Sequence, residues 1–116
     1  MSVLSEELQI YKTTYDLLEM MVDLSRELPK FYRYNVGTRL VDLCLDMLAL
    51  IYQANMDRDA RQQYLTQLLI CNHKIEMLLR VCFRKKIFTA GRYAVYMQLQ
   101  VSIGKQATAW KKNVEH

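Results

Sequence analysis

The sequence predicts an all-α fold, an antiparallel up-down-up-down four-helix bundle in a single domain over residues 1–116. Only three glycines and one proline interrupt the 116 residues, and the long stretches between them are rich in Leu, Met, Ala, Gln, Lys, Arg and Glu. These residue types favour helix. Apolar residues recur in each stretch at alternating steps of three and four, which is the spacing of one helical face. A chain of this length can bury about two-thirds of its unfolded surface, enough to fold without disulfides or metals.

Three breaks divide the chain into four helices. Pro29 ends the first helix, because the residue before a proline is disfavoured in helical conformation. Two polar breaks follow, at 55–57 and 86–89, where Asn, Asp and Thr are good N-cap residues. Short connections make successive helices antiparallel neighbours. The expected helices span about residues 5–28, 35–55, 59–85 and 89–113.

Each helix carries an apolar stripe that predicts its core-facing side. In the first helix the stripe is Leu8, Tyr11, Tyr15, Leu18, Val22 and Ser25. In the second it is Val36, Leu40, Leu43, Met47, Leu50 and Ala54. In the third it is Tyr64, Leu68, Cys71, Ile75, Leu78 and Cys82, and in the fourth Tyr96, Leu99, Ile103, Ala107 and Trp110. The three-residue spacing of Asp59 and Gln62 predicts a capping box at the start of the third helix.

The second and third helices have more apolar surface than one stripe requires. The additional residues are Val41, Cys44, Leu48 and Ile51 in the second helix, and Leu65, Leu69, Leu79 and Phe83 in the third. Two interpretations are open. Bundle helices often bury a wide face, which would place these residues in the core. Alternatively they form a subunit interface, since monomers seldom expose large apolar patches.

The residues that could carry catalysis or bind a metal do not form a recognisable site. A di-iron bundle needs Glu-x-x-His motifs on two helices, whereas His73 is followed by Glu76 in the reverse order and His116 is the last residue. Asp42 and Asp46 are interpreted as a solvated helix face. The glycines, at 37, 91 and 104, are isolated and form no phosphate-binding loop. We therefore predict no catalytic residue, no metal, no cofactor and no enzymatic activity.

The cysteine content and the absence of sorting signals indicate a reduced, cytoplasmic protein. The three cysteines are an odd number and fall on apolar stripes, where a thiol behaves as a small hydrophobe. The N-terminal residues lack the pattern of a signal peptide or a lipidation site. The most apolar run, 40–54, contains two aspartates and is shorter than the roughly 18–20 residues that span a bilayer. No membrane association is expected.

Charge is distributed unequally along the chain. Residues 1–58 contain six basic and nine acidic groups, whereas residues 59–116 contain ten basic and three acidic groups. Cations near helix C-termini complement helix dipoles, but this does not account for the scarcity of acids in the second half. A polarised, basic surface favours a polyanionic partner such as nucleic acid.

The candidate contacts to phosphate gather near the last two helices. Arg80 and Arg84 are one turn apart, opposite the predicted stripe of the third helix, and further cations follow at its end. The first group is Arg80, Arg84, Lys85, Lys86 and Arg92. The second group, on the fourth helix, is Lys105, Lys111 and Lys112.

Several short motifs, in order, resemble those of a known family. They are Tyr11 and Leu18, then Leu28-Pro29-Lys30-Phe31-Tyr32-Arg33, Gly37-x-Arg39, Leu78-Leu79-Arg80-Val81, Tyr93, Ile103-Gly104-Lys105 and Trp110-Lys111. The chain resembles the four-helix bundle family that contains the accessory variability determinant of diversity-generating retroelements and the proteins encoded in intervening sequences of bacterial 23S ribosomal RNA genes. Ala109 departs from the pattern, since many relatives have glycine before the tryptophan.

The resemblance implies a ring-shaped homo-pentamer with a basic surface that binds RNA or DNA and assists a reverse transcriptase in mutagenic complementary-DNA synthesis. It adds Lys30, Arg33 and Arg39 to the candidate phosphate contacts, and it supports Arg80, Lys105 and Lys111. One alternative is a protein–protein adaptor whose basic face docks an acidic partner. Another is a ribosomal RNA intervening-sequence protein of unknown role.

Overall fold

The computed structural model describes residues 3–113 and confirms the all-α four-helix fold. The long helices are α1 (Gln9–Glu27), α3 (Thr38–Met56), α4 (Arg61–Arg84) and α5 (Ala90–Asn113). Three short helical segments complete the described part of the chain: η1 (Ser5–Glu7), α2 (Lys30–Tyr32) and the π-helical η2 (Arg33–Gly37). The molecule is elongated, with dimensions of 45 × 21 × 20 Å. His116 lies outside the described residues.

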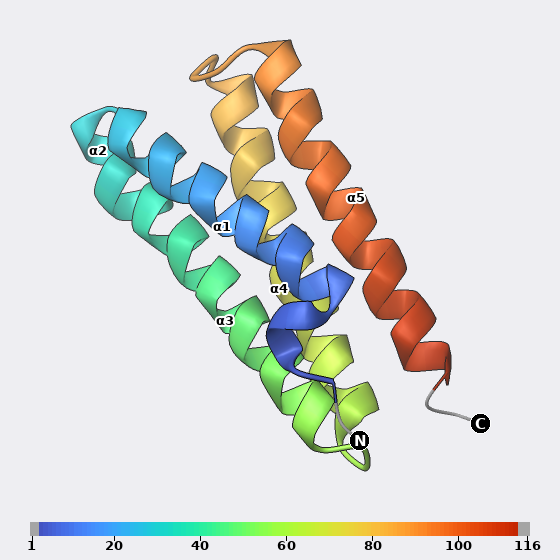
Figure 1. Cartoon of the computed structure of the whole chain (residues 1–116). Helices are drawn as coiled ribbons and strands as arrows, with labels where there is room; N and C mark the ends of the chain where they lie inside the picture. Colours follow the sequence, from blue (N-terminus) through green and yellow to red (C-terminus); the bar gives the residue numbers. More distant parts are fainter. Residues whose placement is uncertain (1–2, 114–116) are drawn as a thin grey trace.

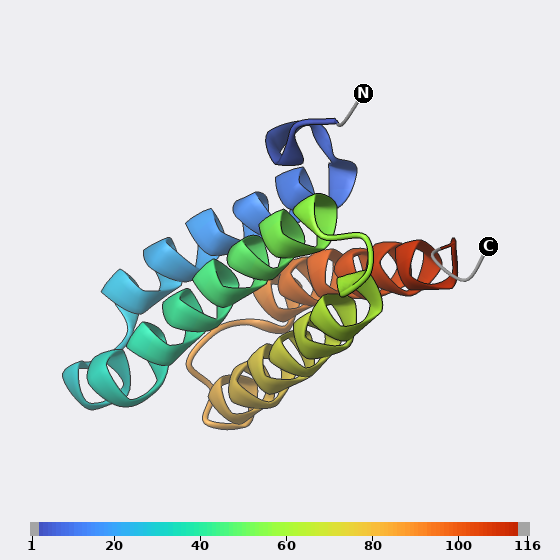
Figure 2. The same cartoon turned by 90° about the horizontal axis from the view of Figure 1, so that it is seen from below.

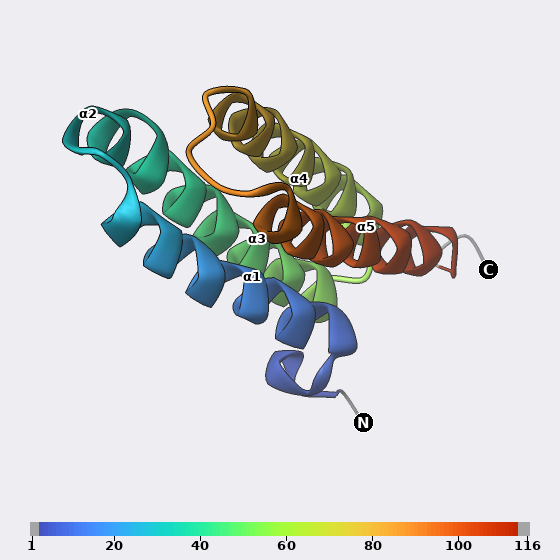
Figure 3. The same cartoon turned by 90° about the horizontal axis from the view of Figure 1, so that it is seen from above.

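The four long helices form a closed, antiparallel arrangement. Helix α3 packs against α1 and α4, and α5 packs against α4 and α1. The chain reverses direction at each connection (Figure 1). Views from below and above show the α1–α3 and α4–α5 connections at one end of the bundle, with η1 and the end of α5 at the other (Figures 2 and 3). All four long helices therefore have one terminus at the end where the two connections lie.

The first connection is shorter than the sequence predicted. Pro29 ends α1 as expected, with Leu28 in extended conformation, but the chain returns to helix at Lys30, so the predicted loop over 29–34 is wrong. The amide of Arg33 donates to the carbonyl of Pro29, because a proline with helix-compatible φ readily begins a helix. One wide turn follows, in which the Thr38 amide donates to the Arg33 carbonyl.

The ends of two other helices also differ from prediction. No Asp59–Gln62 capping box opens α4: the N-cap is Ala60, which offers no side chain. The Asp57 carboxylate instead accepts hydrogen bonds from the amides of Asp59 and Ala60, at 3.1 and 3.2 Å. Helix α1 begins at Gln9 rather than near residue 5, because Leu8 is extended and η1 forms a separate turn before it.

The core-facing side of α1 is not the predicted one. Tyr15 and Val22 of the predicted stripe are exposed, whereas the neighbouring stripe is buried. The buried residues of α1 are Ile10, Thr13, Thr14, Leu17, Met21 and Leu24. The Thr13 hydroxyl donates to the Gln9 carbonyl of the preceding turn, which lets a polar side chain occupy an inward position. Helix α1 is thus rotated by about one residue relative to the expectation.

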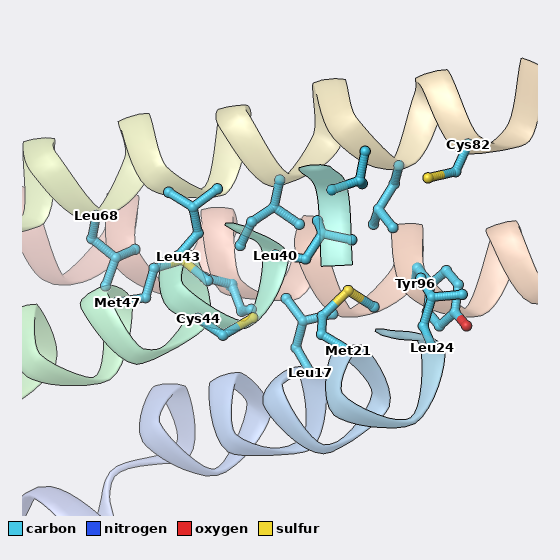
Figure 4. Close-up of a cluster of buried hydrophobic side chains, with 14 of the residues drawn as sticks. Leu17, Met21, Leu24, Leu40, Leu43, Cys44, Met47, Leu68, Cys82 and Tyr96 are labelled. Atoms are coloured by element: carbon cyan, nitrogen blue, oxygen red, sulfur yellow. The ribbon is translucent and has the colours of Figure 1, made fainter. Parts of the chain in front are cut away.

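The core is continuous along the bundle and uses the additional apolar surface of α3. Cys44, Leu48 and Ile51 of the second stripe are buried beside Leu40 and Met47 of the first. Figure 4 shows Leu40, Cys44 and Met47 of α3 in one cluster with labelled side chains of α1, α4 and α5. The wide-face interpretation therefore holds for α3.

None of the described helices is long and apolar enough to cross a bilayer.

The seam between α4 and α5 contains a polar contact that the sequence did not predict. Gln100 is buried in α5, whereas Leu99 of the predicted stripe is half-buried. The side-chain amide nitrogen of Gln100 donates to the backbone carbonyl of Asn72 at 2.8 Å. In return, the side-chain amide nitrogen of Asn72 donates to the backbone carbonyl of Gln100 at 3.0 Å. These bonds satisfy the side-chain nitrogens of both residues, whereas the buried Gln100 Oε1 has no hydrogen-bond partner among residues 3–113.

Candidate nucleic-acid interface

The eleven predicted cations fall into two clusters at one end of the bundle and one group along α5. The first cluster lies on the residues that join α1 to α3, 29–39, here named the η2 corner, and contains Lys30, Arg33 and Arg39. The second lies on residues 84–92, here named the α4–α5 turn, with Arg80 one helical turn before it. The remaining three, Lys105, Lys111 and Lys112, lie on the later part of α5 and are named the α5 group.

The η2 corner is fixed to the end of α1 by Arg33. One guanidinium nitrogen of Arg33 lies 3.3 Å from each of two carbonyl oxygens, those of Arg26 and Leu28, and donates to them. These carbonyls end α1 and lack partners within the helix. Arg33 therefore acts as a C-terminal cap for α1, although its side chain remains exposed to solvent. Lys30 is also exposed and makes no such contact with residues 3–113.

A close approach of η2 to α1 depends on Gly37. A Cβ atom added at Gly37 would lie 2.4 Å from the Ser25 hydroxyl oxygen, 3.1 Å from the Ser25 Cβ and 3.3 Å from a Leu28 methyl. A side chain at this position would therefore force Ser25 and Leu28 to shift. The family-like motif Gly37-x-Arg39 thus has a packing reason at its first residue. Its last residue, Arg39, lies on the exposed face of α3 beside Asp42 and Asp46, which reduce the local positive potential.

The α4–α5 turn begins with a C-terminal cap in which Lys86 has positive φ. The Lys86 amide donates to the Phe83 carbonyl and the Ile87 amide to the Cys82 carbonyl, at 2.9 and 3.0 Å. This is a Schellman motif with Lys86, at φ 61°, in the position that glycine usually occupies. The turn then leads to Thr89, whose hydroxyl accepts from the Arg92 amide and caps α5.

Three cations of the α4–α5 turn are exposed and adjacent. Arg84, Lys85 and Lys86 have no ion-pair partner among residues 3–113. They follow one another at the C-terminus of α4, where the helix dipole favours positive charge. With no carboxylate to neutralise them, they form the most concentrated positive charge among the candidate residues.

Two other candidates are already engaged with carboxylates. Arg80 donates to Glu76 at 3.0 Å on its own helix. Arg92 lies 2.8 Å from Glu27 of α1 and also donates to the Tyr96 hydroxyl at 2.8 Å. Burial works against the charged form of Arg92, but these two bonds outweigh it and raise its pKa. Arg92 therefore joins α5 to α1 and offers less charge to a ligand.

The α5 group borders an apolar groove between α4 and α5. Lys105 and Lys112 line it together with Leu69, Val101, Gly104, Thr108 and Ala109, and its volume is about 540 Å³. None of these lining residues is acidic. Lys111 is half-buried, and its carbonyl accepts from Gln62 of α4. Trp110 packs under the Arg61 guanidinium, whose central carbon is 5.3 Å from the ring centroid.

The remaining chemically reactive side chains show no activation. Burial raises the pKa of Cys44 to about 12 and also raises the pKa of Cys71 and Cys82, so all three thiols stay protonated at neutral pH. His73 and Glu76 lie 3.5 Å apart at the surface of α4. Within residues 3–113, no three side chains of His, Cys, Asp or Glu gather as a metal site requires.

The comparison with protein families identifies the chain. The family described as bAvd-like matches residues 8–114, from just before α1 to just after α5. The protein belongs to the bAvd-like family. No match is found among curated proteins or among solved structures. The bAvd-like match includes both connections at the cationic end of the bundle and the whole of the α5 group.

Sequence reasoning missed two groups of residues in this bAvd-like protein. Phe31 and Tyr34 are exposed at the η2 corner, a feature hidden by the predicted loop. A helical reading of 30–34, which contains no residue that breaks helices, would have placed both on one face. Glu27, the partner of Arg92, could not be found from local spacing because the two residues lie on different helices.

Proposed function

We propose that this bAvd-like protein is a non-enzymatic nucleic-acid-binding accessory protein of a diversity-generating retroelement, acting in the cytoplasm. In this proposal it holds template RNA or nascent complementary DNA beside a reverse transcriptase. The observation that carries the proposal is the unpaired cluster of Arg84, Lys85 and Lys86 at the same end of the bundle as Lys30 and Arg33. Such cations contact phosphates and position a strand without reading its bases.

Assembly would strengthen this binding. The proposed active form is a ring-shaped homo-pentamer, in which each subunit contributes one cationic end to the same strand. Linked weak contacts then act at high effective concentration, and the overall affinity exceeds that of one subunit. Native mass spectrometry tests this part separately: the proposal expects five copies of the 13.8 kDa chain, and a monomer at binding concentrations overturns it.

The test of nucleic-acid binding is a salt titration with matched variants. R84Q/K85Q/K86Q removes the cluster, and K12Q/R58Q/K74Q removes the same net charge from exposed, separate positions. Binding to RNA and DNA is measured by filter retention from low to moderate salt. The cluster variant is expected to lose about tenfold or more in affinity at low salt and to flatten the salt slope by about two to three, whereas the control changes little.

Two results would overturn the proposal. One is the absence of RNA and DNA binding by the unmodified protein at low salt. The other is binding that does not weaken as salt rises, since phosphate contacts release counterions. Equal losses of affinity in the cluster variant and its control would show that the α4–α5 turn is not the site that contacts nucleic acid.

A second candidate function, the protein–protein adaptor, is favoured by the groove between α4 and α5. Its apolar lining and its two flanking lysines suit a helix that carries apolar and acidic residues. Competition distinguishes the two functions. If a reverse transcriptase from the same locus binds tightly while nucleic acid neither binds nor displaces it, and K105Q/K112Q weakens that complex, the adaptor function is correct.

A further inference from the structure

Two aromatic side chains stand out at the η2 corner. Phe31 and Tyr34 are 69% and 68% exposed, the highest values among the large apolar side chains of residues 3–113. They lie three residues apart across α2 and η2, so they project from neighbouring positions of one helical face. Exposed aromatic rings are costly to leave in water. Their proximity along one helical segment makes this tip of the molecule a candidate binding surface.

The rings are carried by a well-fixed backbone. The Asn35 side-chain amide donates to the Phe31 carbonyl at 2.7 Å, and the Thr38 hydroxyl donates to the Arg33 carbonyl at 3.3 Å. Arg33 ties the segment to α1 through two carbonyls. The Tyr32 ring packs edge-on against Phe31, with centroids 5.4 Å apart. A ligand that docks here therefore has little ordering cost to overcome.

The charge around the rings favours an anionic ligand. Residues 28–41 contain three cations and no acid; Arg39 lies beside Asp42 and Asp46, so the positive charge next to the rings comes from Lys30 and Arg33. Glu27, the nearest preceding carboxylate, is engaged with Arg92. Lys30 is exposed next to Phe31 and one turn before Tyr34, within reach of a group stacked on either ring. The like charges of a second η2 corner would repel it, which argues against symmetric pairing of two copies here.

We infer that the η2 corner binds single-stranded nucleic acid by stacking unpaired bases on Phe31 and Tyr34, with Lys30 contacting the adjoining phosphates. Arg33 is a positioning residue, because it holds the turn that presents both rings. The inference rests on the proposed function and narrows it to single strands. Flat aromatic faces bind unpaired bases of any sequence, whereas a duplex hides its base faces within the stack. RNA and DNA strands share this chemistry.

The experiment compares labelled oligo(dT), oligo(U) and a blunt duplex by fluorescence anisotropy. F31A/Y34A is expected to lose about tenfold or more in affinity for the single strands, to change duplex affinity by less than about twofold, and to keep the salt slope. F31L/Y34L should lose as much, since leucine has no flat ring, and F31W/Y34W should retain binding. Y15A/Y52A removes two other exposed tyrosines, on α1 and α3, and should change nothing.

Each outcome decides a separate point. If F31A/Y34A binds single strands as Y15A/Y52A does, the stacking inference fails while the proposed function stands. If the unmodified protein binds none of the three probes, the proposed function itself fails. If F31L/Y34L binds single strands as tightly as the unmodified protein, the inference is overturned. It is also overturned if F31A/Y34A has a changed oligomeric mass but an unchanged affinity. Either result would favour a protein partner or a second copy as the occupant of the η2 corner. A loss for oligo(U) alone, or for oligo(dT) alone, identifies the strand that is bound.

Discussion

The η2 corner and the α4–α5 turn place their aromatic side chains in opposite directions. Both reverse the chain at the same end of the bundle, and both combine cations with aromatic residues. In the η2 corner the aromatic rings of Phe31 and Tyr34 face solvent. In the α4–α5 turn they face inward: Phe88 is buried, and its ring centroid lies 5.9 Å from that of Tyr93 and 5.3 Å from that of Tyr96.

The difference arises from the backbone. At the η2 corner the chain leaves helical geometry only at Leu28 and Pro29, so the following side chains project outward as on any helix surface. At the α4–α5 turn the positive φ of Lys86 redirects the chain and folds Phe88 back over the bundle. Similar compositions therefore yield a surface suited to ligands in one case and a hydrophobic lid in the other.

The largest expected effect comes from removing an inward ring. F88A should lower the free energy of unfolding by about 3–5 kcal/mol, because it leaves a cavity among Phe83, Tyr93 and Tyr96. F31A, at the other connection, should change it by less than about 0.5 kcal/mol. Urea denaturation measures both. Similar losses in the two variants would erase the contrast between the connections.

The next largest effects on stability are expected from substituting one glycine at each connection. G37A should destabilise the protein by about 1–3 kcal/mol, because the added methyl meets Ser25 and Leu28. G91A, in the first turn of α5, places a methyl no closer than 3.8 Å to the Thr89 hydroxyl oxygen. It should be neutral or up to about 1 kcal/mol stabilising. Thermal unfolding of both variants is the measurement, and equal melting temperatures would disprove the close approach at Gly37.

A stabilising change is expected at the residue that redirects the α4–α5 turn. K86G should raise the free energy of unfolding by about 0.5–1 kcal/mol, since glycine adopts positive φ without the steric cost that lysine carries. The matched variant K85G removes the same charge from a residue at φ −82°. It should be neutral or slightly destabilising. A loss of stability in K86G would show that the lysine is not strained in this turn.

The smallest effect concerns the ion pair that links the two connections. A double-mutant cycle of E27Q and R92Q should give a coupling of about 0.5–1 kcal/mol, because both side chains are about half exposed and solvent screens them. Added salt should reduce this coupling. The more exposed pair Arg26 and Asp23 is the control, with a coupling near zero. Equal coupling free energies for the two pairs would show that the pair of Arg92 and Glu27 contributes no more than an ordinary surface ion pair.

The fold could be predicted from the sequence where apolar spacing was unambiguous. In α3 the stripe through Leu40, Leu43 and Met47 is buried as predicted, and the second apolar stripe beside it widens the buried face without changing its direction. In α1 two apolar stripes lie side by side, and the pairs Leu17–Leu18 and Met21–Val22 fit either one. The buried stripe is the one that includes two threonines, because packing against α3 and α5 decided between the alternatives.

The candidate site was predictable as a set of cations but not as an arrangement. Local spacing located Arg84, Lys85 and Lys86 together, and the structure keeps them adjacent and exposed. Local spacing could not reveal that Arg92 forms an ion pair with Glu27, a residue of another helix. Nor could it reveal the outward rings of the η2 corner, since the sequence predicts a loop after Pro29 and the chain forms a helix there.

The amide contact between Asn72 and Gln100 fixes how far α4 and α5 can slide along each other. Leucine and isoleucine side chains tolerate a shift of one helical turn, about 5.4 Å, because one apolar neighbour can replace another. The two amides cannot: after such a shift each would be left in an apolar seam without its partner carbonyl, at a cost of about 1–3 kcal/mol per group. One polar pair thereby sets the axial register of α4 against α5, the second half of the bundle.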